Sequence, residues 1–150
     1  MPAASEPLVR LPHTWRPFGV RIAAVVFGGL LLGVCVFAWF AFDEETRAKF
    51  TVFQRGTLLF LGLLGLATFY ALVRSRVVAE ERTLTVVNGY RKREYEWPEI
   101  VGVHLPPGAP WATLDLSDGS TATALAIQGS DGERARRAVR DLRALASRPH

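Results

Sequence analysis

The chain has 150 residues, 49% of them hydrophobic and 21% charged, and a formal net charge of +4. Two charge-free stretches hold many of the apolar residues: 18 of 21 positions in 22–42 and 13 of 18 in 56–73 are hydrophobic. Only residues 77–150 remain as a contiguous block able to bury a core, which excludes a large soluble enzyme. The single cysteine, Cys35, lies inside the first stretch and excludes a disulfide-stapled secreted scaffold.

Both apolar stretches predict transmembrane helices, because about 20 apolar residues are needed to cross the hydrocarbon core of a bilayer. Residues 22–42 have this length, and residues 56–73 reach it if 51–54 extend the helix and Arg55 reaches towards the surface. The first stretch is too long for a cleaved signal peptide, and no small-x-small cleavage site follows it. Residues 1–21 are then an N-terminal tail and residues 43–55 a connecting loop.

Basic residues near the ends of these stretches predict the orientation. The N-terminal flank has three, the flank after the second stretch has six, and the connecting loop has three that are offset by three acidic residues. We therefore expect a multi-pass protein of the cell (plasma) membrane with both termini in the cytoplasm and residues 43–55 outside.

Glycines in both stretches predict close helix packing, since helices in lipid associate through small residues. Gly29 and Gly33 form a GxxxG pair in the first stretch, and Gly62 and Gly65 lie at helical spacing in the second. A hairpin packed through these faces is the simplest arrangement. Homodimerisation through the same GxxxG face is the alternative. At Cys35 we favour a small buried residue over a lipid-attachment site, because Val34 stands where a small residue is needed.

After residue 76 the sequence alternates between apolar and polar positions, which predicts antiparallel strands. Asn88-Gly89 matches a type I′ turn, and Asp118-Gly119 marks a second hairpin. The expected strands are 77–79, 83–87, 90–97, 100–105, 111–116 and 120–127.

The C-terminal residues predict one amphipathic helix that ends near Ser147. Ser130 and Glu133 match a capping box at its start. Apolar residues then recur at steps of three and four and mark one face. The fold class is thus a membrane helical hairpin followed by a small α+β domain, an antiparallel sheet or partial barrel with a C-terminal helix at residues 77–147.

The order of these features resembles a known family. Trp97-Pro98-Glu99-Ile100 after a basic strand, then Leu114-Asp115-Leu116-Ser117-Asp118-Gly119 and a closing helix, are similar to the bacterial PH-like domain of the low-molecular-weight protein antigen 6 type. The resemblance covers about residues 77–145. It implies a PH-like fold and a small membrane protein of actinobacteria. Most proteins of this type have no assigned activity. The excess of arginine over lysine agrees with a GC-rich genome.

PH folds imply lipid phosphate binding by basic residues of an early hairpin. Arg91, Lys92 and Arg93 are the candidates for lipid-headgroup contact, because guanidinium groups match phosphate oxygens. Neighbours in a strand point to opposite faces, however, so a solvated strand face is the competing interpretation. A second basic surface is expected on the C-terminal helix and is interpreted as solvated; it comprises Arg136, Arg137, Arg140 and Arg143.

No catalytic site, metal site or cofactor is predicted. The three histidines, His13, His104 and His150, are scattered. His104, Asp115 and Ser117 have the residue types of a triad, but strand alternation and hairpin chemistry explain Asp115 and the residues that follow it. Trp97 and Trp111 are expected to pack in the core or on the sheet.

The sequence therefore predicts a non-enzymatic membrane protein whose PH-like domain serves binding or assembly at the cytoplasmic face. An anionic lipid or a membrane protein is the expected partner. Nucleic acid is not, because residues 77–150 contain as many acidic as basic residues. The alternative is an accessory or structural subunit of a membrane complex, bound through its transmembrane hairpin.

Overall fold

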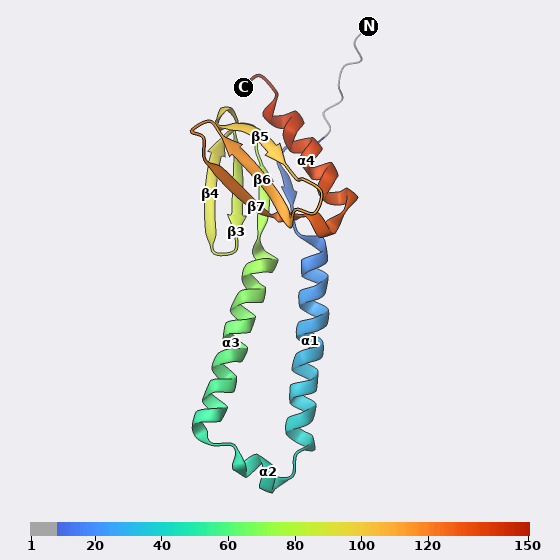
Figure 1. Cartoon of the computed structure of the whole chain (residues 1–150), viewed down its shortest axis with the longest axis vertical. Coiled ribbons are helices and arrows are strands. Elements are labelled where there is room, and N and C mark those ends of the chain that lie inside the picture. Colours follow the sequence, from blue (N-terminus) through green and yellow to red (C-terminus); the bar gives the residue numbers. More distant parts are fainter. Residues whose placement is uncertain (1–8) are drawn as a thin grey trace.

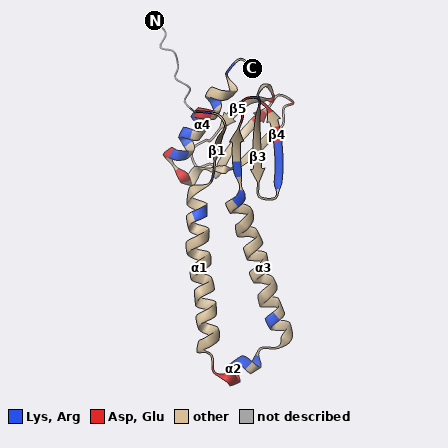
Figure 2. Ribbon diagram, turned by 180° about the vertical axis from the view of Figure 1, so that it is seen from behind, with Lys and Arg blue, Asp and Glu red and all other residues tan. Residues whose placement is uncertain are grey.

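The computed structural model describes residues 9–150. It shows a long helical hairpin with a small β-rich domain at one end (Figure 1). The hairpin consists of α1 (Phe18–Ala41), α2 (Glu44–Lys49) and α3 (Val52–Arg74). α1 and α3 leave the domain side by side and diverge towards α2, which lies at the far end. Charged residues gather in the domain and around α2, whereas the middle of each long helix has none (Figure 2).

α1 and α3 are long and apolar enough to cross a membrane. With 24 and 23 residues at about 1.5 Å each, they are about 36 and 35 Å long. Most of their apolar side chains are exposed: only 6% of the most apolar segment of α1 and 0% of that of α3 are buried within the chain. α1 begins four residues before the predicted 22–42 stretch and ends one residue before the end of that stretch, at Ala41.

The turn between the long helices is a small helix with its own caps. Asp43 accepts a hydrogen bond from the amide of Thr46, and Thr51 and Gln54 form a capping box that starts α3. Residues 52–54 therefore extend the second helix, as predicted. The Arg55 guanidinium donates to the Arg47 carbonyl over 2.9 Å and lies 5.5 Å from the ring centre of Trp39.

The domain has two antiparallel sheets covered by one helix. The first sheet has the order β1-β2-β3-β4 and the second β5-β6-β7. The strands are β1 (His13–Trp15), β2 (Arg76–Ala79), β3 (Thr83–Asn88), β4 (Arg91–Glu96), β5 (Ile100–His104), β6 (Trp111–Leu116) and β7 (Thr121–Gln128). Short 3-10 helices follow β4 and β7: η1 (Trp97–Glu99) and η2 (Gly129–Asp131). The last element is α4 (Glu133–Ala146), which lies against the sheets (Figure 1).

The segment before α1 belongs to this domain, which corrects its description as a tail. β1 pairs with β2 in the register His13 to Ala79 and Trp15 to Val77. The N-terminal segment thus supplies the seventh strand, so the chain enters the domain, leaves through α1 and returns through α3. Residues 1–8 lie outside the described part of the chain.

The predicted type I′ turn at Asn88-Gly89 is wrong by one residue. Asn88 pairs with Arg91, which leaves Gly89 and Tyr90 as the two loop residues. Gly89 has a φ of +61°, and among residues 9–150 only glycines have positive φ, a pattern typical of a type II′ turn. The Asn88 side chain donates a hydrogen bond to the Thr123 carbonyl over 2.6 Å and accepts one from the Leu125 amide over 3.0 Å. It therefore joins the two sheets.

The second hairpin has the predicted turn. Gly119 has a φ of +85°, and the Asp118 carboxylate accepts hydrogen bonds from the amide and hydroxyl of Ser120 over 2.8 and 2.6 Å. These two donors hold the pKa of Asp118 below its ordinary value, because they stabilise the charged form.

The predicted capping box at Ser130 and Glu133 does not form. α4 begins at Glu133, and its N-cap is Gly132, whose φ of +57° suits glycine. Ser130 lies in η2 instead. The expected apolar face of α4 is confirmed: its buried residues are Ala135, Ala138, Val139, Leu142 and Leu145.

One hydrophobic core lies between the two sheets and α4. Trp97 is buried in it and donates from Nε1 to the Glu80 carbonyl over 2.9 Å, so its predicted role is confirmed. Trp111 differs, because it begins β6 and its residue surface is 40% exposed. The cause is its position at the end of a strand, next to the 105–110 loop.

Candidate functional site

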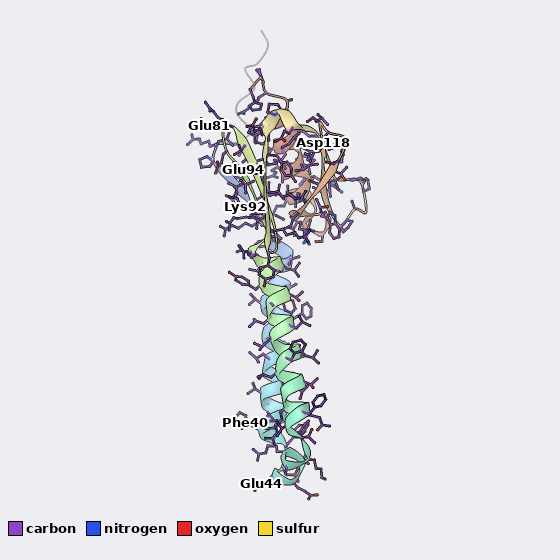
Figure 3. All side chains as sticks on the ribbon, turned by 90° about the vertical axis from the view of Figure 1, so that its left-hand side faces the viewer. Phe40, Glu44, Glu81, Lys92, Glu94 and Asp118 are labelled. Carbon is purple, nitrogen blue, oxygen red and sulfur yellow. The ribbon has the colours of Figure 1, made fainter. Side chains whose placement is uncertain are left out.

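The basic run Arg91, Lys92 and Arg93 lies on β4, one of the two edge strands of the first sheet. All three residues are exposed. Lys92 pairs with Val87 and Arg93 with Val86, so consecutive side chains point to opposite faces of the sheet. Lys92 lies closer to the helices than Glu94 on the same strand (Figure 3). The strand therefore does not direct the three charges to one point.

The hairpin turn before this run is fixed to the end of α3. The Gly89 amide donates to the Ser75 hydroxyl over 2.9 Å, and this hydroxyl donates to the Ala71 carbonyl over 3.0 Å. Ser75 is only 2% exposed. A Cβ on Gly89 would lie 3.3 Å from the Ala71 Cβ, so the turn touches the helix.

Tyr90 extends this contact down the helix. Its hydroxyl donates to the Ala67 carbonyl over 2.7 Å. The Arg74 guanidinium lies 5.8 and 5.6 Å from the ring centres of Tyr70 and Tyr90, at a distance typical of cation–π contacts. The tip of the β3-β4 hairpin thus lies beside the last two turns of α3.

The start of α1 is bound to the domain at a second junction. The Asp131 carboxylate accepts hydrogen bonds from the Phe18 and Gly19 amides over 3.1 and 3.0 Å. A carboxylate in this position satisfies free amides and complements the helix dipole. A Cβ on Gly19 would lie 2.8 Å from this carboxylate. The Arg134 guanidinium stacks 4.4 Å from the Phe18 ring centre.

An arginine-lined cavity of about 560 Å³ opens at this second junction, between the β1-α1 segment and α4. Four arginines line it: Arg16, Arg21, Arg134 and Arg137. Within residues 9–150, no carboxylate forms an ion pair with any of them. The cavity is in the size range of small-ligand sites. We call it the junction cavity.

Asp141 is the acidic residue among those that line the junction cavity. Burial raises its pKa, because desolvation disfavours the charged carboxylate, while the nearby His13, Arg140 and Arg137 act in the opposite direction. The cavity therefore keeps a strong excess of positive charge.

The helix arginines predicted as one basic surface are all exposed, but they have different partners. Arg137 lines the junction cavity. Arg140 and Arg136 lie 2.7 and 3.9 Å from the carboxylate of Glu133, and the Arg140 hydrogen bond is the main reason why the pKa of Glu133 is lowered. Arg143 donates to the Val103 carbonyl over 2.7 Å and joins α4 to β5. With 3.6 residues per turn, Arg136, Arg140 and Arg143 share one side of α4, and Arg137 lies next to them. All four are exposed, as expected for a solvated surface, and only Arg137 also lines the junction cavity.

Sequence reasoning missed the junction cavity. Arg16 and Arg21 come from the start of the chain, and Arg134 and Arg137 come from α4. The i, i+3 spacing of the last two indicates a shared helix face. No local pattern shows that this face meets the segment before α1.

The four candidate helix-packing glycines face open space. No side chain or other helix lies within 4 Å of the position that a Cβ would take on Gly29, Gly33, Gly62 or Gly65. The expected packing of α1 on α3 through these glycines is therefore not observed, because the helices diverge. Their use by a second copy or another protein stays a prediction.

Two residues of the triad considered from sequence do meet. His104 Nε2 lies 2.6 Å from Asp115 Oδ2, on the neighbouring strands β5 and β6. A Cβ on Gly102 would lie 2.8 Å from this Nε2 atom, so the glycine leaves room for the pair. Both side chains are about half exposed. Ser117 donates its amide to the Glu99 carbonyl. Within residues 9–150, no group of three or more His, Cys, Asp or Glu residues is arranged to hold a metal ion.

Comparison with known proteins agrees with this architecture. The profile of the bacterial PH domain family matches residues 74–145. The chain is 33% identical to the uncharacterized protein Rv1417 of Mycobacterium tuberculosis and to the uncharacterized protein Mb1452 of Mycobacterium bovis. Each alignment covers 94% of this chain and 89% of the relative. No solved structure matches significantly. The resemblance stated from the sequence is confirmed, and the chain belongs to the bacterial PH domain family.

Proposed function

We propose that this protein is a non-enzymatic binding or assembly module that holds its PH domain at the cytoplasmic face of the cell membrane. The helical hairpin is the anchor, and the domain offers a binding surface next to the lipid headgroups. The observation that carries the proposal is the way in which the domain is bound to both apolar helices.

Both junctions are short and hydrogen-bonded. Asp131 caps α1 directly, and the Ser75 hydroxyl joins the end of α3 to the β3-β4 turn. A domain fixed in this way stays within a few ångströms of the helix ends, which raises its effective concentration at the membrane surface. Weak contacts to lipid or to another membrane protein are then sufficient for binding.

The distribution of aromatic and charged residues supports this placement. Tyr70 and Tyr90 surround Arg74 at one end of α3, and Trp39 and Phe50 lie 5.9 Å apart near the other end of the hairpin. Aromatic residues of this kind are enriched at both membrane interfaces. Nine basic residues flank the two apolar stretches on the domain side, and three lie in the connecting loop, which favours a cytoplasmic domain.

Cysteine labelling in a Cys35→Ala background tests the anchor and its orientation. Ala48→Cys places a thiol on α2, and Ser120→Cys places one on the turn between β6 and β7; both positions are exposed. In intact protoplasts, a membrane-impermeant maleimide is expected to label position 48 only. Lysis is expected to expose position 120. Equal labelling of both before lysis, or recovery of the chain in the soluble fraction, would overturn the proposal.

The second candidate function is an accessory subunit held in a membrane complex by α1 and α3. The open space around Gly29, Gly33, Gly62 and Gly65 favours it, because these faces are free for another helix. Gly29→Leu with Gly33→Leu is expected to abolish complex formation in this case and to leave the PH domain folded. If crosslinking in the native membrane captures the same neighbours with the double variant, the accessory function is excluded.

A further inference from the structure

The junction cavity combines positive charge from two distant parts of the chain. Arg16 and Arg21 lie on either side of the start of α1, and Arg134 and Arg137 lie on the first turns of α4. Arg134 is held towards α1 by its stacking on Phe18. Four guanidinium groups around one cavity repel each other, and among the described residues that line it Asp141 is the acidic one. An anion in the cavity would relieve this repulsion and gain charge-assisted hydrogen bonds.

Guanidinium groups favour one class of anion. Their planar donors match the oxygens of a phosphate or a phosphodiester, and Arg is preferred where such groups are recognised. The cavity volume of about 560 Å³ accommodates a headgroup of this kind.

The surroundings of the cavity distinguish a lipid from a free phosphate. Phe18 lines it and is 52% exposed, and Ile22 and Val25 on the next turns of α1 are 50% and 74% exposed. An apolar path therefore leads from the arginines along the helix. A ligand with an anionic head and an apolar tail fits both parts, whereas inorganic phosphate uses only the first.

We propose that the junction cavity binds the phosphate headgroup of an anionic phospholipid of the cytoplasmic leaflet, with its acyl chains along Phe18 and Ile22. This inference rests on the proposed membrane location. It places lipid recognition between the β1-α1 segment and α4 and not on the β4 run of Arg91, Lys92 and Arg93. Binding here would connect the β1-α1 segment to α4 and fix the orientation of the domain on the membrane.

Two triple variants of the full chain separate these sites, since each removes three positive charges. Arg16→Gln/Arg134→Gln/Arg137→Gln changes the junction cavity, and Arg91→Gln/Lys92→Gln/Arg93→Gln changes β4. Arg21 stays, so that the two variants remove the same number of charges. Phosphatidylglycerol is titrated into the protein in neutral detergent micelles, with phosphatidylcholine as the uncharged reference, and retained lipid is counted by native mass spectrometry.

The cavity variant is expected to weaken phosphatidylglycerol binding about tenfold or more, and the β4 variant less than about twofold. Phosphatidylcholine binding is expected to be weak and unchanged. Equal losses in both variants, or a larger loss in the β4 variant, would overturn the proposal. Inorganic phosphate that binds as tightly as the lipid would also overturn it, because the apolar path would then contribute nothing.

A matched pair of single variants covers the case in which the triple variant does not fold. Arg137 and Arg136 are neighbours on α4, but only Arg137 lines the junction cavity, while Arg136 pairs with Glu133. Arg137→Gln is expected to weaken lipid binding and Arg136→Gln to leave it unchanged; the same effect from both contradicts the proposal. The micelle titration does not depend on topology, so a chain that fails the labelling test can still bind lipid, and the two failures are distinguishable.

Discussion

The hairpin and the PH domain contain the same types of apolar side chain, but these are exposed in the hairpin and buried in the domain. In the domain, Leu84, Leu114 and Leu142 are 0% exposed, whereas Leu61 and Leu63 of α3 are 55% and 59% exposed. The domain supplies its own apolar surroundings through two sheets and a helix. The hairpin does not, so its apolar surface needs surroundings from outside the chain. The free energy of folding of the domain and the proposed membrane insertion of the hairpin should therefore respond to different substitutions.

The largest expected effect comes from one substitution made in both regions. Leu114→Ala should lower the free energy of unfolding of the domain by about 2–5 kcal/mol, because it leaves a cavity in a packed core. Leu61→Ala should leave this free energy unchanged, since the side chain has little cover in the chain. Urea denaturation in mild detergent, followed by tryptophan fluorescence, measures both. Equal losses would show that the hairpin has packing that the structure does not contain.

A charge placed in each region sharpens the difference. Leu63→Arg should oppose membrane insertion by about 2.5–3.5 kcal/mol, the cost of an arginine near the centre of a membrane helix. Val101→Arg, at a position 65% exposed on β5, should have no such effect. The fraction of each chain in the carbonate-resistant membrane pellet is the measurement. If the two variants partition alike, α3 is not surrounded by lipid.

Asp131 connects the two regions, so its removal should loosen them from each other. Asp131→Ala removes the acceptor of the Phe18 and Gly19 amides and should cost about 0.5–2 kcal/mol. Hydrogen exchange at these two amides should become faster. Asp131→Asn keeps an acceptor and should have a smaller effect, and the first amides of α3 serve as the internal reference. Unchanged exchange at Phe18 and Gly19 would mean that the junction does not depend on this cap.

Sequence patterns predicted the elements whose periodicity is long and local. The apolar stretches, the strands from residue 77 to 127 and the apolar face of α4 each follow from repeats within one segment. The size of Trp97 predicts that it packs in the core or on the sheet. These features need no knowledge of what lies far away in the chain.

The features that sequence did not predict all depend on distant partners. β1 has three residues, too few for periodicity, and forms because β2 lies beside it. The pattern of Ser130 and Glu133 predicts a cap for α4 that does not form. Asp131, which lies between them, caps α1 and accepts a hydrogen bond from the Phe18 amide, 113 positions away in the sequence. Asn88 was assigned to a turn because its side chain's partners on β7 were unknown. The junction cavity was missed for the same reason.

The smallest expected effect concerns pH and is expected at two carboxylates of the domain, Asp118 and Asp141, whose pKa values are shifted in opposite directions. The lowered pKa of Asp118 means that its carboxylate stabilises the folded state above the ordinary value of 3.8, and that this contribution is lost as the pH falls through the lowered pKa. Asp118→Asn should therefore lower the Tm near about pH 6 but not near about pH 2.5.

Asp141 provides the opposite sign in the same domain. Its pKa is raised by burial, so the protonated form favours folding, and this contribution is lost as the pH rises through the ordinary value towards the raised one. Asp141→Asn should raise the Tm near about pH 6 relative to the unchanged chain, the reverse of Asp118→Asn. Thermal denaturation at both pH values measures the two shifts. Shifts of the same sign would show that the cavity arginines, and not burial, dominate the environment of Asp141.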